Sequence, residues 1–102
     1  MRNPAAQGLP DANHAAIVKA YKDCYCSVFE THHVGFGFPD LIIGVGGVTC
    51  LVEIKGEDGH LRASQETFIS TWRGGKVEVV RTRQDVIDHV TRVRSRFEGR
   101  SK

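Results

Sequence analysis

The sequence of 102 residues contains few cysteines, few prolines and no long apolar run. Its three cysteines are an odd number, with two of them in expected strands, so they do not form a disulfide framework and a reducing compartment fits them. No signal peptide is recognised, and no apolar segment is long enough to span a bilayer. We therefore expect a cytoplasmic protein that acts where it is made and has no membrane partner.

The sequence also lacks internal repeats, low-complexity segments and a large excess of either charge, since its formal net charge is +2. Hydrophobic residues make up 40% of the chain and charged residues 25%, as in ordinary soluble domains. A chain of this length can bury one core but not two. We expect a flexible leader at residues 1–10, one domain at 11–97 and a basic tail at 98–102.

The most informative stretch is a pair of β-branched runs that flanks Gly46 and Gly47. This pattern predicts a β-hairpin with the two glycines as its loop. Counting from that turn places Asp40 opposite Glu53, and Lys55, two residues further on, returns to the same face. The other pairs expected from this register are Val45 with Val48, Ile43 with Cys50, and Leu41 with Val52.

The two faces of the expected hairpin differ in kind. One face is wholly apolar, whereas the other carries Asp40, Glu53 and Lys55 at the end away from the turn. Two carboxylates opposite each other repel unless a cation lies between them. One interpretation is a structural ion pair with Lys55. The other, which we favour, is a hard-oxygen site for Mg²⁺ or Mn²⁺, with room for water and a phosphate oxygen.

The same residues carry a family resemblance. Pro39-Asp40, followed by Glu53-Ile54-Lys55, is similar to the signature of the PD-(D/E)XK nuclease superfamily. A longer pattern resembles its virus-type replication-repair (VRR-NUC) branch and covers residues 37 to about 82. That pattern consists of Gly37-Phe38-Pro39-Asp40-Leu41, then Glu53-Ile54-Lys55-Gly56, and further on Leu61 and Ser64-Gln65.

The resemblance implies a metal-dependent DNA endonuclease, which hydrolyses phosphodiester bonds. Asp40 and Glu53 would hold Mg²⁺ or Mn²⁺, with the backbone carbonyl of Ile54 as a further ligand. Lys55 would orient or help to deprotonate the attacking water and stabilise charge on the phosphate, and Gln65 would complete the active site. Small stand-alone members act as homodimers on branched DNA such as the Holliday junction, which implies the same here, in a bacterial or phage-infected cell.

The first expected helix lacks one feature of this pattern. Its apolar stripe runs to about Lys22, with Asp11 as the N-cap. The VRR-NUC pattern usually has an acidic residue in this helix, but the helix contains no Glu. His14 stands at about that position, where it would either serve as a ligand or water-positioning group or simply pack. Glu30, in the following strand, is the other candidate for the missing acid, unless it faces water.

A strand is expected over residues 25–31, with Cys24 before it, Cys26 within it, and His32 and His33 after it. A zinc site built from these four residues is disfavoured. A Cys-x-Cys pair within a strand has no knuckle turn, and adjacent histidines point to opposite faces. We expect the two histidines to form a polar lip with a glycine-rich loop that a nucleic-acid backbone can approach closely.

The remaining segments complete an α/β fold. A helix capped by Ser64 is expected to run to about Arg73 and to end at two glycines, before a strand over residues 76–81 that pairs in parallel with the hairpin. Thr82 and Asp85 resemble the capping box of a last helix. The predicted order is helix, three strands, helix, strand, helix. The resemblance makes this the restriction-endonuclease-like αβββαβ core, with helices on both faces of a mixed sheet.

The last helix carries Arg92, Arg94 and Arg96, which we expect to contact DNA phosphates, with a solvated helix face as the alternative. Two other classes of function stay open. One is a catalytically impaired DNA-binding module that keeps the nuclease fold. The other is an accessory protein that uses the hairpin only for assembly.

Overall fold

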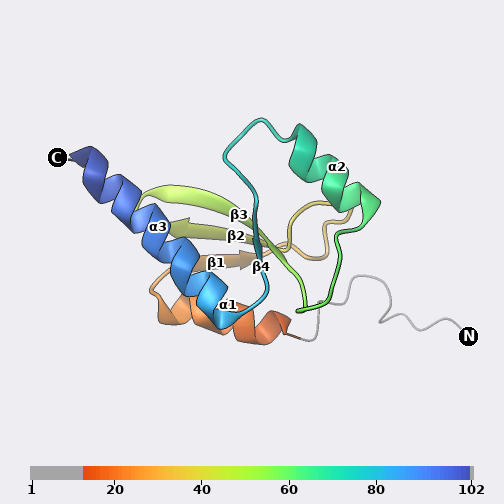
Figure 1. Ribbon diagram of the computed structural model, residues 1–102, viewed down its shortest axis with the longest axis horizontal. Helices are drawn as coiled ribbons and strands as arrows, with labels where there is room; N and C mark the ends of the chain where they lie inside the picture. The colour runs from red at the N-terminus through yellow and green to blue at the C-terminus, as the bar shows by residue number, and fades with distance from the viewer. Residues whose placement is uncertain (1–12, 102) are drawn as a thin grey trace, which may run out of the picture.

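A computed structural model describes residues 13–101 of the chain, and the side chains of residues 13–96. Its elements follow one another as helix, three strands, helix, strand and helix, which confirms the predicted order and the α/β class (Figure 1). The predicted leader and the N-cap at Asp11 lie outside the described residues. The elements are α1 (His14–Asp23), β1 (Ser27–Glu30), β2 (Leu41–Val45), β3 (Val48–Ile54), α2 (Ala63–Thr71), β4 (Glu78–Val80) and α3 (Arg83–Ser101).

The four strands form one mixed sheet in the order β1-β2-β3-β4. The pairs β1–β2 and β2–β3 are antiparallel, whereas β3 and β4 are parallel, as predicted from the helix between them. The hairpin register is also the predicted one. Its pairs include Leu41 with Val52, Ile43 with Cys50, and Val45 with Val48.

Gly46 and Gly47 close this hairpin in left-handed backbone conformations, with φ angles of 58° and 79°. A two-residue turn with positive φ at both positions matches the twist of the flanking strands, and glycine adopts it without steric cost. Because side chains alternate along a strand, a shift of one residue would exchange the two faces. The turn therefore decides that Leu41 and Ile43 enter the core.

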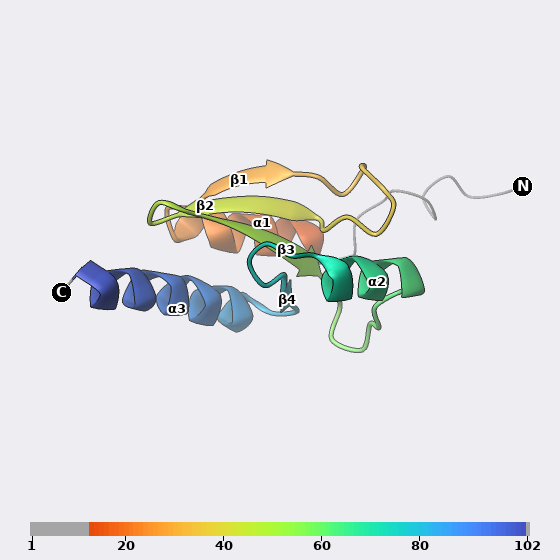
Figure 2. The ribbon, with the colours of Figure 1, turned by 90° about the horizontal axis from the view of Figure 1, so that it is seen from above.

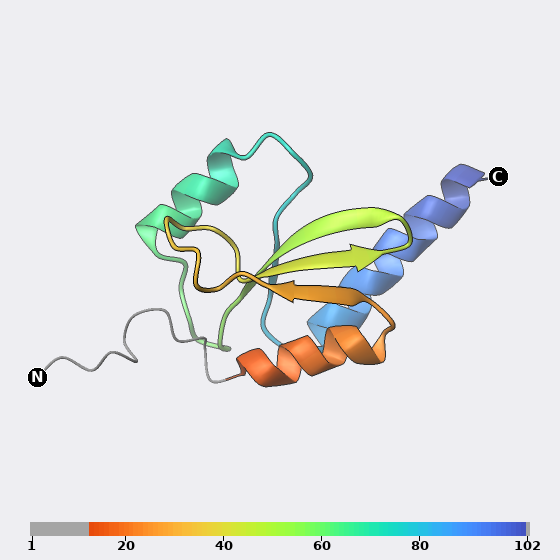
Figure 3. The same cartoon turned by 180° about the vertical axis from the view of Figure 1, so that it is seen from behind.

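Helices α1 and α3 pack side by side on one face of the sheet (Figure 2). Helix α2 instead lies beyond the end of the sheet, next to the loop that joins β1 to β2 (Figure 3). On the other sheet face, Thr49 is exposed and Leu51 is half-buried. The prediction of helices on both faces thus holds only in part. The core on the covered face consists of Ile17, Val18, Ala20, Tyr21, Cys26, Leu41, Ile43, Val45, Val52, Ile54, Val80, Val86, Val90 and Val93.

The predicted boundaries of two strands are wrong by one or two residues. β1 begins at Ser27 rather than at residue 25, because Tyr25 has a φ of 63°, which no extended strand accommodates. β4 spans only Glu78–Val80 of the predicted range 76–81. Within β1, Phe29 is exposed and Val28 is half-buried, so the two residues face opposite sides of the sheet.

The prediction that Ser64 caps α2 is also wrong. The N-cap is Arg62, whose backbone N–H donates a hydrogen bond of 2.8 Å to Oε1 of Gln65. Among the apolar side chains of α2 and its C-cap, Phe68 and Ile69 are half-buried and Trp72 is 45% exposed. The buried side chain of α2 is that of Gln65, so a polar contact positions the helix.

Helix α3 begins as predicted, because Thr82 and Asp85 form a capping box. The backbone N–H of Asp85 donates to Oγ1 of Thr82, and the backbone N–H of Thr82 donates to Oδ2 of Asp85, both at 3.1 Å. Val86, Val90 and Val93 of this helix are buried in the core, and the side chain of Phe97 lies outside the described residues. No helix in the described part of the chain is both long enough and apolar enough to cross a membrane.

A buried polar pair joins α1 to α3 inside the core. The hydroxyl group of Tyr21 and Nδ1 of His89 lie 2.7 Å apart. Burial lowers the pKa of His89 from its ordinary value of 6.5, and this outweighs the carboxylate of Glu78, which acts in the opposite direction. Three nearby cations, Arg92, Arg96 and Lys76, lower the pKa further. The folded protein therefore resists protonation of this ring.

We expect the free energy of unfolding to fall as the pH drops below about 6.5. In this range the unfolded chain takes up a proton at His89 that the folded chain does not bind, so acid favours unfolding. Replacing His89 by glutamine should flatten this part of the pH profile, as measured by urea unfolding at pH 5 and pH 7.5. The exposed His60 provides the matched control, and a His60→Gln variant with the same flattened profile would contradict the assignment.

Candidate functional site

Two carboxylates meet where β2 begins and β3 ends. Asp40 immediately precedes β2, and Glu53 is the next-to-last residue of β3. Because Leu41 pairs with Val52, the register brings Asp40 alongside Glu53, as predicted. Oδ2 of Asp40 accepts a hydrogen bond of 2.8 Å from the backbone N–H of Ile54. This bond fixes the Asp40 carboxylate to the strand that carries Glu53.

Glu53 is the most buried of the charged residues predicted for the site, with an exposed fraction of 1%. Its Oε2 accepts a hydrogen bond of 2.8 Å from Nε2 of Gln65 and lies 3.7 Å from Nζ of Lys55. Burial, and next the neighbouring Asp40 carboxylate, raise the pKa of Glu53 to about 8, against the opposing effect of Lys55. Lys55 alone therefore does not neutralise the acidic pair.

Gln65 reaches Glu53 because the first turn of α2 packs against the loop before β2. Gly37 in that loop has a φ of 79°, and a Cβ atom at this position would overlap the backbone carbonyl of Ser64. The Phe38 ring also packs edge-on against Phe68, with ring centroids 5.3 Å apart. These contacts hold α2 where its first turn faces the carboxylates.

The side-chain amide of Gln65 is held from both ends. Its oxygen accepts from the backbone N–H of Arg62, and its nitrogen donates to Glu53. The amide orientation is therefore determined, and the nitrogen is the atom that faces the carboxylate. The predicted proximity of Gln65 to the site is confirmed by this contact, whereas its part in catalysis stays a prediction.

The donor set fits a divalent hard cation. Asp40 and Glu53 offer carboxylate oxygens, which are the ligands that Mg²⁺ and Mn²⁺ prefer in proteins. Burial and the neighbouring Asp40 raise the pKa of Glu53, so a proton and a cation would compete for this carboxylate. The Ile54 residue joins the site through its backbone N–H, and its carbonyl as a metal ligand stays a prediction.

The backbone at Lys55 and in the turn after it is held by two residues that the sequence analysis did not single out. Nδ2 of Asn13 donates to the backbone carbonyl oxygens of Lys55 at 3.2 Å and of Arg81 at 2.9 Å. Nη1 of Arg81 donates to the carbonyl oxygens of Gly56 and Gly59, each at 2.7 Å. These bonds connect residues that are far apart in the chain, so no local pattern predicts them. They fix the strand end from which the Lys55 side chain projects.

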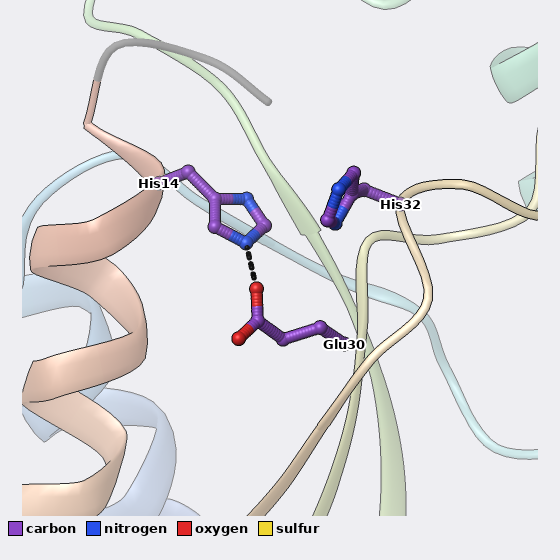
Figure 4. A group of neighbouring side chains, drawn as sticks. All are labelled: His14, Glu30 and His32. Atoms are coloured by element: carbon purple, nitrogen blue, oxygen red, sulfur yellow. Dashed lines mark hydrogen bonds and ion pairs between the residues drawn. The ribbon is translucent and has the colours of Figure 1, made fainter. Parts of the chain in front are cut away.

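His14 does not contact the carboxylate pair through any hydrogen bond found among the described residues. Its Nε2 lies 2.9 Å from Oε1 of Glu30, and its ring meets that of His32 edge-on, at 5.0 Å between centroids (Figure 4). Both candidates for the missing first-helix acid are therefore engaged with each other. Glu30 lies on an edge strand and its side chain is 47% exposed, as the alternative held, but it also contacts His14. His32 joins this group from the turn that follows β1, in which the backbone N–H of Val34 donates to the Thr31 carbonyl at 3.0 Å.

The three arginines predicted to bind DNA lie on α3, which covers the sheet face opposite the carboxylates. Arg92 forms an ion pair of 2.6 Å with Glu78, and Arg94 donates to the backbone carbonyl of Cys24 at 2.7 Å. For Arg96, which is exposed, no hydrogen bond or ion pair is found within residues 13–96. The structure thus does not bring these side chains to the site. DNA contact by them stays a prediction.

Comparison with known proteins finds no related sequence or structure. No protein-family model matches the chain, and no curated protein or solved structure shows significant similarity to it.

Proposed function

We propose that this chain is a metal-dependent DNA endonuclease in which Asp40 and Glu53 hold Mg²⁺ or Mn²⁺. The observation that carries the proposal is the convergence of these two carboxylates with Lys55 and Gln65 at one end of the sheet. When bound, the metal would polarise a phosphodiester and lower the pKa of a bound water molecule. The likeness of residues 37–82 to the VRR-NUC branch of the PD-(D/E)XK nucleases supports this assignment.

Each residue of the site would have a separate task. Asp40 is oriented by the Ile54 N–H, and Glu53 is oriented by Gln65, so both carboxylates are held in place before a substrate arrives. Lys55 carries three donors on a flexible stem and would position the attacking water and stabilise negative charge developing on the phosphate. Gln65 would act on the reaction through Glu53.

The proposed substrate is branched DNA, such as a four-way junction, and the proposed active form is a homodimer. A single domain of this size offers little surface for phosphate contacts, and a two-fold dimer doubles that surface and presents two sites. The exposed Arg96 is the arginine of α3 that supports a phosphate contact best, since Arg92 and Arg94 already have partners within the fold.

A second candidate function is a DNA-binding module that retains the nuclease fold but cleaves poorly. It is favoured by the contact between His14 and Glu30, because neither candidate for the missing first-helix acid adds its charge to the pair Asp40 and Glu53. A site with fewer carboxylates holds a divalent cation less tightly.

A cleavage assay separates the two functions. The assay compares labelled four-way junction, flap and linear duplex DNA, each with Mg²⁺, with Mn²⁺ or with a chelator. We expect the junction to be cut fastest in the presence of either metal. Retention of DNA without cleavage at any metal concentration would identify the binding module. Neither cleavage nor binding of any of the three DNAs would contradict both proposals.

A further inference from the structure

A cluster of two histidines and one carboxylate lies apart from the pair Asp40 and Glu53. His14 comes from the first position of α1, Glu30 from the last position of β1, and His32 from the loop that follows (Figure 4). One ligand atom from each of these three side chains lies within 4.8 Å of the others, and the closest pair is 2.9 Å apart. Segments distant in the chain therefore bring three metal-binding groups to one point.

The contacts within the fold leave nitrogen atoms of this cluster unsatisfied. His14 is 5% exposed, and its Nδ1 has no hydrogen-bond partner among the described residues. Nδ1 of His32 is also buried without a partner in that part of the chain. Buried polar atoms are nearly always paired in folded proteins, so a cluster with two orphaned nitrogens calls for an explanation. Nε2 is the His14 nitrogen that faces Glu30, so an ion among the three side chains would bind Nε2 of His14 and leave its Nδ1 unpaired, and His32 would supply a second nitrogen lone pair.

The geometry is close to that of a bound ion. Ligand atoms that surround Zn²⁺ tetrahedrally at 2.0–2.1 Å lie about 3.3 Å from one another. The distances between ligand atoms in the cluster range from 2.9 Å to at most 4.8 Å, which includes this value. Side-chain shifts of about 1 Å would therefore bring the three atoms to the spacing that a zinc ion requires. The Glu30 side chain is 47% exposed and has room for such a shift. A surface hollow lies beside His14 and Glu30, and its lining is completed by Ala15, Val18, Lys19 and Lys22.

We propose that His14, Glu30 and His32 form a second metal centre, selective for a transition-metal ion such as Zn²⁺ over Mg²⁺. Two imidazoles and one carboxylate suit Zn²⁺ and its neighbours, whereas Mg²⁺ prefers a set of oxygen ligands. Three protein ligands leave a fourth position for water. This centre differs from the disfavoured site of Cys24, Cys26, His32 and His33, because it takes one ligand from α1 and none from a cysteine.

The centre would hold α1 against the loop that carries Asp40. Thr31 lies between Glu30 and His32, and its backbone N–H donates to the Asp40 carbonyl at 2.7 Å. Its hydroxyl group donates to the carbonyl of Pro39 at 2.8 Å. An ion bound to Glu30 and His32 would therefore fix the chain on both sides of the residue that anchors Asp40.

Titration of the metal-free protein with Co²⁺ and Zn²⁺ tests the proposal. We expect one equivalent of Co²⁺ to give visible absorption bands of a four-coordinate nitrogen and oxygen site, without the near-ultraviolet band that thiolate ligands produce. Zn²⁺ should displace Co²⁺, and a large excess of Mg²⁺ should not. His32→Ala and Glu30→Gln should each weaken Zn²⁺ binding at least about a hundredfold, as measured by calorimetry.

The matched control is His33→Ala, which removes an exposed histidine next to the cluster and should leave Zn²⁺ affinity unchanged. Asp40→Asn distinguishes the two metal sites, because it should remove Mg²⁺-dependent cleavage while the Co²⁺ spectrum persists. A Co²⁺ spectrum that survives in both His32→Ala and Glu30→Gln would overturn the second centre, as would its loss in Asp40→Asn. Both cluster variants alter partly exposed side chains, so we expect them to fold, and circular dichroism can verify this.

Discussion

Replacing Asp40 by asparagine should abolish metal-dependent DNA cleavage and leave the protein folded. The asparagine oxygen can still accept the hydrogen bond that Ile54 donates at 2.8 Å, so the local geometry is retained. The variant loses the negative charge needed to hold the cation. We expect single-turnover cleavage to fall at least about a hundredfold, which corresponds to about 2.7 kcal/mol.

The stability of this variant provides a second readout. Without a metal, Asp40→Asn removes one of two repelling acids, so its thermal unfolding midpoint should not fall below that of the wild type. The control is Asp58→Asn, which alters an exposed carboxylate in the loop after β3. If Asp40→Asn cuts at a rate close to wild type, or if Asp58→Asn is equally inactive, the metal assignment is wrong.

Replacing Lys55 should separate metal binding from the chemical step. The ammonium group lies 3.7 Å from Glu53 and cannot itself ligate a cation, so its removal leaves the carboxylate ligands in place. Lys55→Met keeps most of the buried stem and should bind Mn²⁺ at least as tightly as wild type, because a repelling charge is gone. The same variant should cleave at least about a hundredfold more slowly in single-turnover assays.

Lys55→Arg distinguishes catalysis from charge balance. A planar guanidinium does not give up its proton and does not fit the space of a compact ammonium, so this variant should also be poor. If Lys55 only offsets the charge of Asp40 and Glu53, arginine should restore cleavage. Weak Mn²⁺ binding by Lys55→Met in calorimetry, with cleavage rescued by excess Mn²⁺, would also overturn the catalytic role. The exposed Lys76 gives the matched control, Lys76→Met.

The features of the fold that could be predicted from the sequence are the hairpin register and the start of α3, because residues close together in the chain determine both. The glycine pair at Gly46 and Gly47 sets a two-residue turn, and the period of two along each strand then sets every partner up to Asp40 and Glu53. The capping box of Thr82 and Asp85 is equally local. These predictions succeed because the relevant contacts lie within a few residues of the turn or the cap.

The placement of α2 and of His14 depends on contacts that no local pattern contains. α2 has the composition of a helix that covers a sheet, but Phe68 stacks with Trp72 and packs against Phe38 in the loop. His14 stands where the resemblance requires an acid, and the closing of α1 over β1 brings it to Glu30. The third member, His32, follows Glu30 by two residues but lies in a turn, so strand alternation does not predict it. Its place beside His14 depends on the position of α1.

The two glycines of the hairpin also have a consequence for the order in which the molecule assembles. The bonds that build the carboxylate site span 14 residues for Ile54 to Asp40 and 12 for Gln65 to Glu53. The bonds that join the two long helices span 68 residues for Tyr21 to His89 and 70 for Arg94 to Cys24. Closing a short loop costs less chain entropy than closing a long one, and hairpins form within microseconds. The geometry of the carboxylate pair can thus be in place before the chain ends meet, so slow docking of α3 would delay the burial of the core more than the formation of this pair.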